Sequence, residues 1–168
     1  RWNQLSAPLQ TQLDLSVPSP REGYRMRAEF RVWHSGEALN YVMFPPGEPG
    51  NPQIVTEFRA AHTAIQQLMP TLLAAIQAQP LLRRKLFQIE FLVTLSGDRL
   101  VSLIYHRPLD ALWENEAAQI AQHLGISIVG RSRGQKRVVG RDYVEETLCI
   151  DGRDFHYRQY EQSFTQPN

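Results

Sequence analysis

The sequence predicts an α+β domain built on an antiparallel β-sheet of hairpins, with two main helices packed on one face. Two patterns predict it: apolar residues alternate along several short segments, and they recur at spacings of three and four along two longer ones. With 168 residues, of which 42% are hydrophobic and 21% charged, the chain is sized for one substantial core. We expect one domain over residues 23–162, after an irregular, proline-containing lead-in over residues 1–22.

The first strand runs from Tyr24 to Trp33, because its residues alternate strictly between two faces. One face is apolar and comprises Tyr24, Met26, Ala28, Phe30 and Val32. The other carries Arg25, Arg27, Glu29, Arg31 and Trp33. A second run, 39–44, follows Gly36 and completes a hairpin before the turn-rich segment 45–50.

A helix is predicted from Thr56 to Gln79, with its apolar stripe at Phe58, Ala61, Ile65, Leu68, Leu72 and Ile76. Pro70 lies inside this pattern and removes one backbone hydrogen bond, at a cost of about 3 kcal/mol. We therefore expect a kink there, or two consecutive shorter helices.

The clearest hairpin joins residues 87–95 to a return strand at 99–106, and both strands should be central. Asp110 then caps a second helix that ends before Gly125. The remaining segments are short predicted strands: 127–130, 135–139, 143–150 and 153–157. Asp151-Gly152 predicts a type I′ turn between the last two.

Composition excludes several classes of protein. A net charge of +1 does not indicate nucleic-acid binding, and no apolar run approaches the roughly 18 residues of a membrane span. The single cysteine, Cys149, cannot form an intrachain disulfide, and we expect it to be inert and partly buried. The five histidines lack the spacing of a zinc site, so we expect no metal. No catalytic motif is present, so we expect no catalytic residue in this chain, and the single cysteine and the lack of a membrane span favour a cytoplasmic location.

Two basic clusters leave alternatives open. Residues 131–141 contain five basic and no acidic residues, and Arg83-Arg84-Lys85 precedes the central hairpin. These side chains would either neutralise phosphates or form a solvated surface balanced by distant acids. Arginines interleaved with Trp33 favour RNA, because looped RNA is bound by aromatic and guanidinium stacking.

Several stretches resemble the bacterial tRNA (uracil-5-)-methyltransferase family, in order and in spacing: residues 24–34, 85–89, 101–106, 157–159 and 163–168. The resemblance implies the N-terminal RNA-recognition domain of an enzyme that methylates carbon 5 of the T-loop uridine at tRNA position 54. The enzyme forms ribothymidine, with S-adenosylmethionine as methyl donor. The expected partner is the tRNA T-arm. Residues 163–168 would begin the linker into a methyltransferase domain that this excised chain lacks.

The same resemblance implies roles for particular residues. Phe87 would support the reorganised T-loop, Arg31 and His106 would lie near the RNA with Arg25 and Arg27, and Gln166 would contact the methyl donor. Alternation alone, in contrast, favours a core position for Phe87, in register with residues 89 and 91.

The family's nucleophilic cysteine belongs to the following domain, and Cys149 does not match it. We therefore expect that the chain alone neither binds S-adenosylmethionine nor transfers methyl groups. A self-sufficient RNA-binding or RNA-refolding module, or a protein-interaction domain with an arginine face, remain as alternatives.

Overall fold

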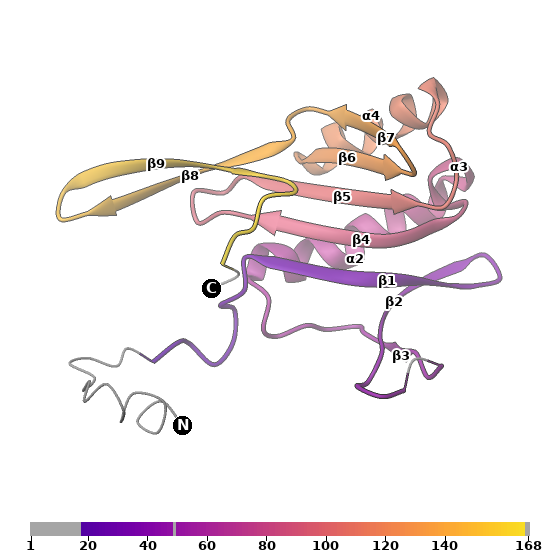
Figure 1. The fold of residues 1–168 in the computed structure, drawn as a ribbon, viewed down its shortest axis with the longest axis horizontal. Coiled ribbons are helices and arrows are strands. Elements are labelled where there is room, and N and C mark those ends of the chain that lie inside the picture. The colour runs from indigo at the N-terminus through magenta and orange to yellow at the C-terminus, as the bar shows by residue number, and fades with distance from the viewer. Residues whose placement is uncertain (1–17, 49, 167–168) are drawn as a thin grey trace.

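The computed structural model describes residues 18–48 and 50–166, and it contains one large sheet, one separate hairpin and three helices (Figure 1). The elements, in chain order, are β1 (Arg27–Ser35), β2 (Ala38–Met43), β3 (Gln53–Ile54), α2 (Thr63–Ala78), α3 (Pro80–Arg83), β4 (Leu86–Val93), β5 (Arg99–Tyr105), α4 (Ala111–Leu124), β6 (Ser127–Ser132), β7 (Gln135–Val139), β8 (Tyr143–Ile150) and β9 (Arg153–Tyr160). Most of the predicted lead-in lies outside the described residues. The predicted α+β class is confirmed.

Seven strands form the large sheet in the order β3-β2-β1-β4-β5-β6-β7, so β4 and β5 are central as predicted. Every neighbouring pair is antiparallel except β5 and β6, which run parallel. The predicted antiparallel sheet of hairpins therefore includes one parallel pair that the sequence did not indicate. Helix α4 connects the two strands and returns the chain to the end of the sheet at which β5 began. Such a crossover makes the neighbouring strands parallel.

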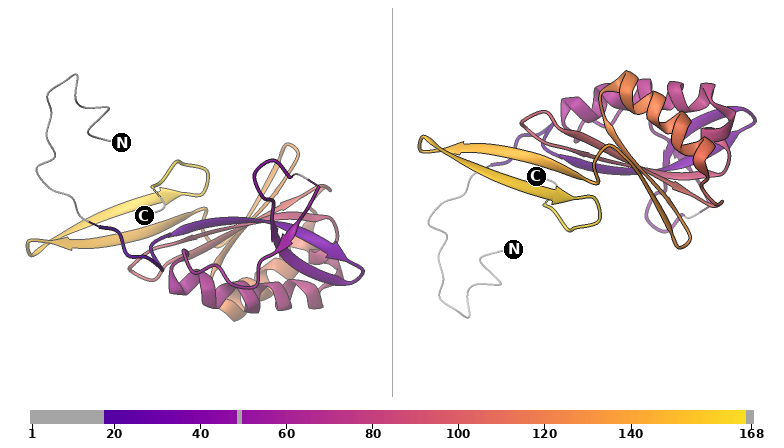
Figure 2. Two further views of the ribbon diagram at one scale, coloured as in Figure 1. Left: turned by 90° about the horizontal axis from the view of Figure 1, so that it is seen from below. Right: turned by 90° about the horizontal axis from the view of Figure 1, so that it is seen from above.

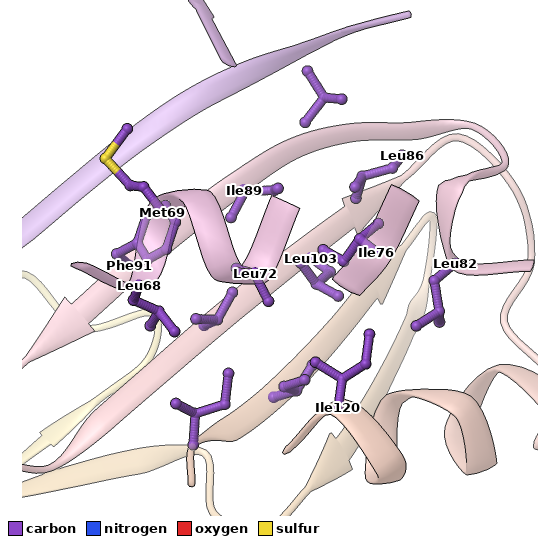
Figure 3. Packing of buried hydrophobic residues seen from close by; sticks show 14 of the residues in the cluster. Leu68, Met69, Leu72, Ile76, Leu82, Leu86, Ile89, Phe91, Leu103 and Ile120 are labelled. Carbon is purple, nitrogen blue, oxygen red and sulfur yellow. The ribbon is translucent and has the colours of Figure 1, made fainter. Parts of the chain in front are cut away.

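The helices cover one face of the sheet, and the other face is left to loops and to the β8–β9 hairpin (Figure 2). Leu68, Leu72 and Ile76 of α2 pack toward Ile89 and Leu103 of the central strands, and all five are almost fully buried (Figure 3). Burying side chains of this size is worth about 1.5–3 kcal/mol each. This layer therefore fixes the sheet and leaves its opposite face, called the open face below, available for other contacts.

Helix α2 begins at Thr63, seven residues later than predicted. Phe58 does pack in the core, with its ring 5.3 Å from that of Phe30, but it does so from a loop. The backbone of this loop bonds to the segment before β1, where the Arg25 N–H donates to the Ala60 carbonyl at 2.9 Å. The apolar residues of this loop are buried by loop packing, and their spacing happens to match that of a helix.

Pro70 lies inside α2 without dividing it, so the expected division into two helices is wrong at that position. The helix ends instead before Pro80, which begins the short α3. The hydroxyl of the adjacent Thr71 donates to the carbonyls of Gln67 and Leu68 at 3.3 and 3.1 Å, but not to the carbonyl of Gln66, whose helical donor Pro70 lacks.

Helix α4 follows the prediction at both ends. The Asp110 carboxylate accepts the N–H of Trp113 at 2.9 Å, and Gly125 adopts the left-handed conformation with φ of 62°. Trp113 is fully buried against Gly130 of β6, where an added Cβ would lie 2.2 Å from its ring. A side chain at residue 130 would therefore displace the helix.

The β8–β9 hairpin extends beyond the end of the sheet (Figure 2). Its turn has positive φ at Asp151 and Gly152, as the type I′ prediction requires. Val144 joins a small apolar cluster on the open face, and the Glu146 carboxylate accepts the N–H groups of Leu95 and Ser96 at 2.7 and 3.0 Å. These contacts attach the base of the hairpin to the sheet.

The structure bears on the expected burial of Cys149 and on the expected lack of a membrane span. Cys149 lies in β8 and is exposed, so the expectation of partial burial is wrong. No helix among the described residues is long and apolar enough to cross a membrane.

Candidate functional site

A β-bulge at the start of β4 changes the face on which Phe87 lies. Leu86 pairs with Tyr105 and Gln88 pairs with Ile104, so Phe87 is an extra residue between them. Leu86 is buried in the core. Phe87 is only half-buried and lies on the open face. The core position that alternation favours is therefore wrong for Phe87.

Bonds from both neighbouring strands hold this bulge. Lys85, immediately before it, has φ of 56°, which non-glycine residues rarely adopt, and its carbonyl accepts the N–H of His106 at 3.1 Å. From β1, Nε2 of His34 lies 2.8 Å from the Leu86 carbonyl oxygen, and it donates because a carbonyl can only accept. Nothing in the sequence marks His34 for this role, since the bond depends on how β1 and β4 are paired.

The bulge brings three of the predicted residues together from neighbouring strands. The rings of Phe87 and His106 stack with centroids 4.0 Å apart and planes inclined by 27°. The guanidinium carbon of Arg31 lies 3.9 Å from the centroid of the Phe87 ring. We call this group, from β1, β4 and the end of β5, the Arg31–Phe87–His106 cluster.

An open pocket of about 740 Å³ adjoins the cluster. Its lining comprises Arg31, Val32, Trp33, His34, Phe44 and Phe87. Trp33 is 47% exposed and Phe44 37% exposed, which is unusual for side chains of this size. The pocket therefore offers three aromatic rings and one guanidinium group to a planar ligand.

The other predicted arginines lie away from the cluster: Arg27 begins β1, and Arg25 comes two residues before it. Four residues of strand separate Arg27 from Arg31, or roughly 13 Å at the usual rise. Arg27 donates to the carbonyls of Glu161 and Ser163 at 2.7 and 2.9 Å. Its contacts therefore hold the segment that follows β9.

Glu161 anchors the same segment with its side chain. It is buried, and its carboxylate accepts the Ser102 hydroxyl at 2.9 Å and Nε of Arg131 at 2.6 Å, with a second bond from that guanidinium. Burial opposes ionisation, but the hydrogen bonds from Arg131 and Ser102 outweigh it and lower the pKa of Glu161. We call this group the Glu161 anchor; nothing in the sequence pattern pointed to it.

Gln166, the candidate donor contact, is exposed near the end of the described chain. A pocket of about 690 Å³ beside the Glu161 anchor is lined by residues up to Thr165. Gln166 therefore does not border this pocket.

Ion pairs occupy most of the basic window 131–141. Arg131 pairs with Glu161, Lys136 with Asp142, Arg137 with Glu114, and Arg141 with both Asp98 and Glu145. Arg133 is exposed and has no ion pair with a residue that the structure describes. Four of the five basic residues therefore pair with acids, as the alternative of a surface balanced by acids predicts. Among the described residues, no three His, Cys, Asp or Glu side chains are grouped to hold a metal ion.

Comparison with solved structures finds the same fold in an archaeal enzyme. The Pyrococcus abyssi tRNA (uracil-54, C5)-methyltransferase, solved with S-adenosyl-L-homocysteine, matches 99% of this chain with a TM-score of 0.62. The two sequences are 16% identical, and the match covers 43% of the archaeal chain. This similarity concerns the fold alone.

Comparison of sequences is more specific. The chain is 52% identical over 168 residues to the tRNA/tmRNA (uracil-C(5))-methyltransferase of Stutzerimonas stutzeri, and 54% identical to that of Azotobacter vinelandii. Each match covers the whole of this chain and 46% of the relative, so the chain spans about half the length of these proteins. The sequence profile of the tRNA (Uracil-5-)-methyltransferase family matches residues 2–168. This chain therefore belongs to the tRNA (uracil-5-)-methyltransferase family, of which it represents an N-terminal portion.

Proposed function

We propose that this chain is the RNA-recognition part of an enzyme that methylates carbon 5 of the uridine at position 54, in the T-loop of tRNA. The observation that carries the proposal is the Arg31–Phe87–His106 cluster, which gathers planar groups on the open face. The family supports a tRNA substrate, and the Pyrococcus abyssi enzyme of the same fold is a tRNA (uracil-54, C5)-methyltransferase.

The chemistry of the substrate explains why such a cluster is useful. A base inside a stacked loop must leave the stack before its ring can react, and this costs a few kcal/mol. Aromatic rings and guanidinium planes offset the cost by stacking on bases of the rearranged loop. In this proposal Phe87 holds the Arg31 guanidinium and the His106 ring against its two faces, and the outer planes of these two groups stack on bases of the rearranged loop. Trp33 and Phe44 supply a second wall for an unstacked base.

Arg25 and Arg27 enter the proposal differently. Arg27 bonds to the chain after β9, and Arg25 lines the pocket beside it. We assign Arg27 chiefly to positioning the segment from Glu161 to Gln166, and Arg25 to RNA that reaches this end of the sheet. Both assignments differ from direct support of the T-loop.

The chemical step would belong to the remainder of the protein. S-adenosylmethionine would supply the methyl group there, with Gln166 as one contact at the junction. Cys149 lies on the exposed hairpin strand β8, away from the cluster, which is unsuitable for attack on a base held at Phe87. The 168-residue chain alone should therefore transfer no labelled methyl group to T-loop RNA; detectable turnover would contradict this part of the proposal.

The test of recognition compares a T-arm stem-loop with an unrelated hairpin of the same length, by fluorescence anisotropy at low salt. We expect the chain to prefer the T-arm. Phe87→Ala should weaken T-arm binding by about 1–3 kcal/mol, or roughly 5- to 150-fold in Kd. Phe155→Ala is the matched control, because Phe155 is a 41% exposed aromatic residue of β9 outside the cluster.

Each outcome has a distinct meaning. Equal binding to both RNAs would instead favour a general RNA-binding module. Absence of binding to either RNA would overturn the proposal and favour a protein partner. An equal effect of the Phe87 and Phe155 substitutions would remove the cluster from recognition.

A further inference from the structure

A second pocket lies on the other side of His106 from Phe87. It measures about 830 Å³ and is bounded by the loop after β5 and by the β6–β7 turn. Its lining includes His106, Arg107, Arg131, Ser132 and Arg133. Because β5 and β6 are parallel, both end at the edge of the sheet where β4 begins (Figure 1). This pocket therefore continues the surface of the Arg31–Phe87–His106 cluster.

Arg133, in the β6–β7 turn, is a basic residue whose charge no acidic residue of the described chain neutralises. Arg131, two residues earlier, is held by the buried carboxylate of Glu161. Arg107 is committed to structure, since its guanidinium donates to the carbonyls of Arg84, Leu81 and Pro108 at 3.0, 2.7 and 2.9 Å. Arg133, in contrast, is exposed at the pocket and makes no ion pair within the described part of the chain.

Arg84 and Lys85, two more cations without an acidic partner in the described chain, lie beside the loop after β5. The bond from Arg107 fixes the backbone of Arg84, and the bond from the His106 N–H fixes that of Lys85. Both side chains are exposed, and neither has an ion pair with any residue in 18–48 or 50–166. The preceding Arg83 does have one, with Glu37. Arg84 and Lys85 therefore flank one side of His106, while Arg133 borders the pocket on the other.

We infer that Arg84, Lys85 and Arg133 form a track for RNA phosphates that passes the end of β5. The inference rests on the proposed function and extends it, because the cluster would hold bases and the track would hold the backbone next to them. Phosphate contacts fix the register of a nucleic acid and carry no sequence information. The track selects three cations from the two basic clusters and leaves out those that acids already neutralise.

Salt dependence gives a direct test. Each cation that neutralises a phosphate releases bound counterions, which adds about 0.7–0.9 to the slope of log Kd against log salt concentration. We would measure T-arm binding by the 168-residue chain from 50 to 200 mM NaCl. The variants are Arg133→Ala, the double variant Arg84→Ala/Lys85→Ala, and Arg141→Ala. The last is the matched control, since it removes one positive charge that Asp98 and Glu145 already pair.

We expect the slope to fall by about 0.7–0.9 for Arg133→Ala, by about twice that for the double variant, and by little for Arg141→Ala. The preference for the T-arm over the unrelated hairpin should not change. If T-arm binding still depends on Phe87 while the slopes of the track variants equal that of the unsubstituted chain, the track is wrong and the proposed function stands. If neither the unsubstituted chain nor any variant binds RNA at 50 mM NaCl, the track and the proposed function are both wrong.

Discussion

Replacing Glu161 by glutamine should loosen the attachment of the chain after β9. In the structure this buried carboxylate accepts one bond from Ser102 and two from Arg131. A glutamine of the same shape keeps one oxygen, but it places an NH₂ group where the second oxygen accepted a guanidinium N–H. One charge-assisted bond becomes a contact between two donors, and the ion pair is lost.

The magnitude follows from the environment of the two partners. Hydrogen bonds to charged groups contribute about 1.5–3 kcal/mol to stability. The Glu161 side chain is 3% exposed and that of Arg131 22% exposed, so solvent replaces the lost partner only partly. We therefore expect Glu161→Gln to lower the free energy of unfolding by about 2–3 kcal/mol. Glu145→Gln is the control, because its pairs with Arg141 and Arg158 are half exposed and should contribute less than about 1 kcal/mol.

The assay is urea denaturation followed by tryptophan fluorescence, repeated from pH 7 down to about pH 3, which lies below the ordinary glutamate pKa. The pKa of Glu161 is lowered in the folded chain, so the unfolded chain binds more protons as the pH falls below the ordinary glutamate value. The contribution of Glu161 is therefore complete near neutral pH and decreases as the pH falls through the lowered pKa. The difference between the two chains should shrink on acidification. A loss below about 0.5 kcal/mol at pH 7, or a difference that does not depend on pH, would refute the reasoning.

Three further outcomes follow from the packing and exposure of single residues. Gly130→Ala should lower the free energy of unfolding by about 1–3 kcal/mol, because the added methyl group meets the ring of Trp113; unchanged urea curves would contradict this packing. Phe91→Ala should cost about 3–5 kcal/mol, whereas Phe87→Ala should cost only about 1 kcal/mol, and a similar loss of melting temperature for both would return Phe87 to the core. Cys149 should react fully with a thiol reagent in the native state, and protection until urea is added would show that the β8 thiol is covered.

Local sequence signals predicted the elements that local contacts determine. Helix α4 matched at both ends, because Asp110 and Gly125 bond within their own helix. Helix α2 did not match at its start, because the loop containing Phe58 is held by pairing with the segment before β1. The parallel pairing of β5 with β6 was missed for the same reason, since strand neighbours are set by packing between distant segments.

In the candidate site, too, the sequence predicted what depends on local pattern and missed what depends on contacts between distant segments. The polar face of β1 is visible in the alternation that places Arg31 opposite Phe30. The position of Phe87 is not, because a bulge that depends on Lys85 and on bonds from two other strands reverses its face. The family resemblance grouped Phe87 with Arg31 and His106, where alternation favoured the core. The partners of the basic window lie up to 43 residues away, as for Arg141 and Asp98, so only the structure could show which cations remain uncommitted.

The central claim is that the Arg31–Phe87–His106 cluster contacts RNA, and a direct measurement is NMR of the 168-residue chain with labelled phenylalanine rings. On titration with a T-arm stem-loop, the ring resonances of Phe87 should shift because a base that stacks on His106 or Arg31 changes their local field, while those of Phe155 and the buried Phe91 should stay in place. Phe87→Ala would assign the shifting signal. Saturating T-arm RNA that leaves the Phe87 resonances unmoved would contradict the account.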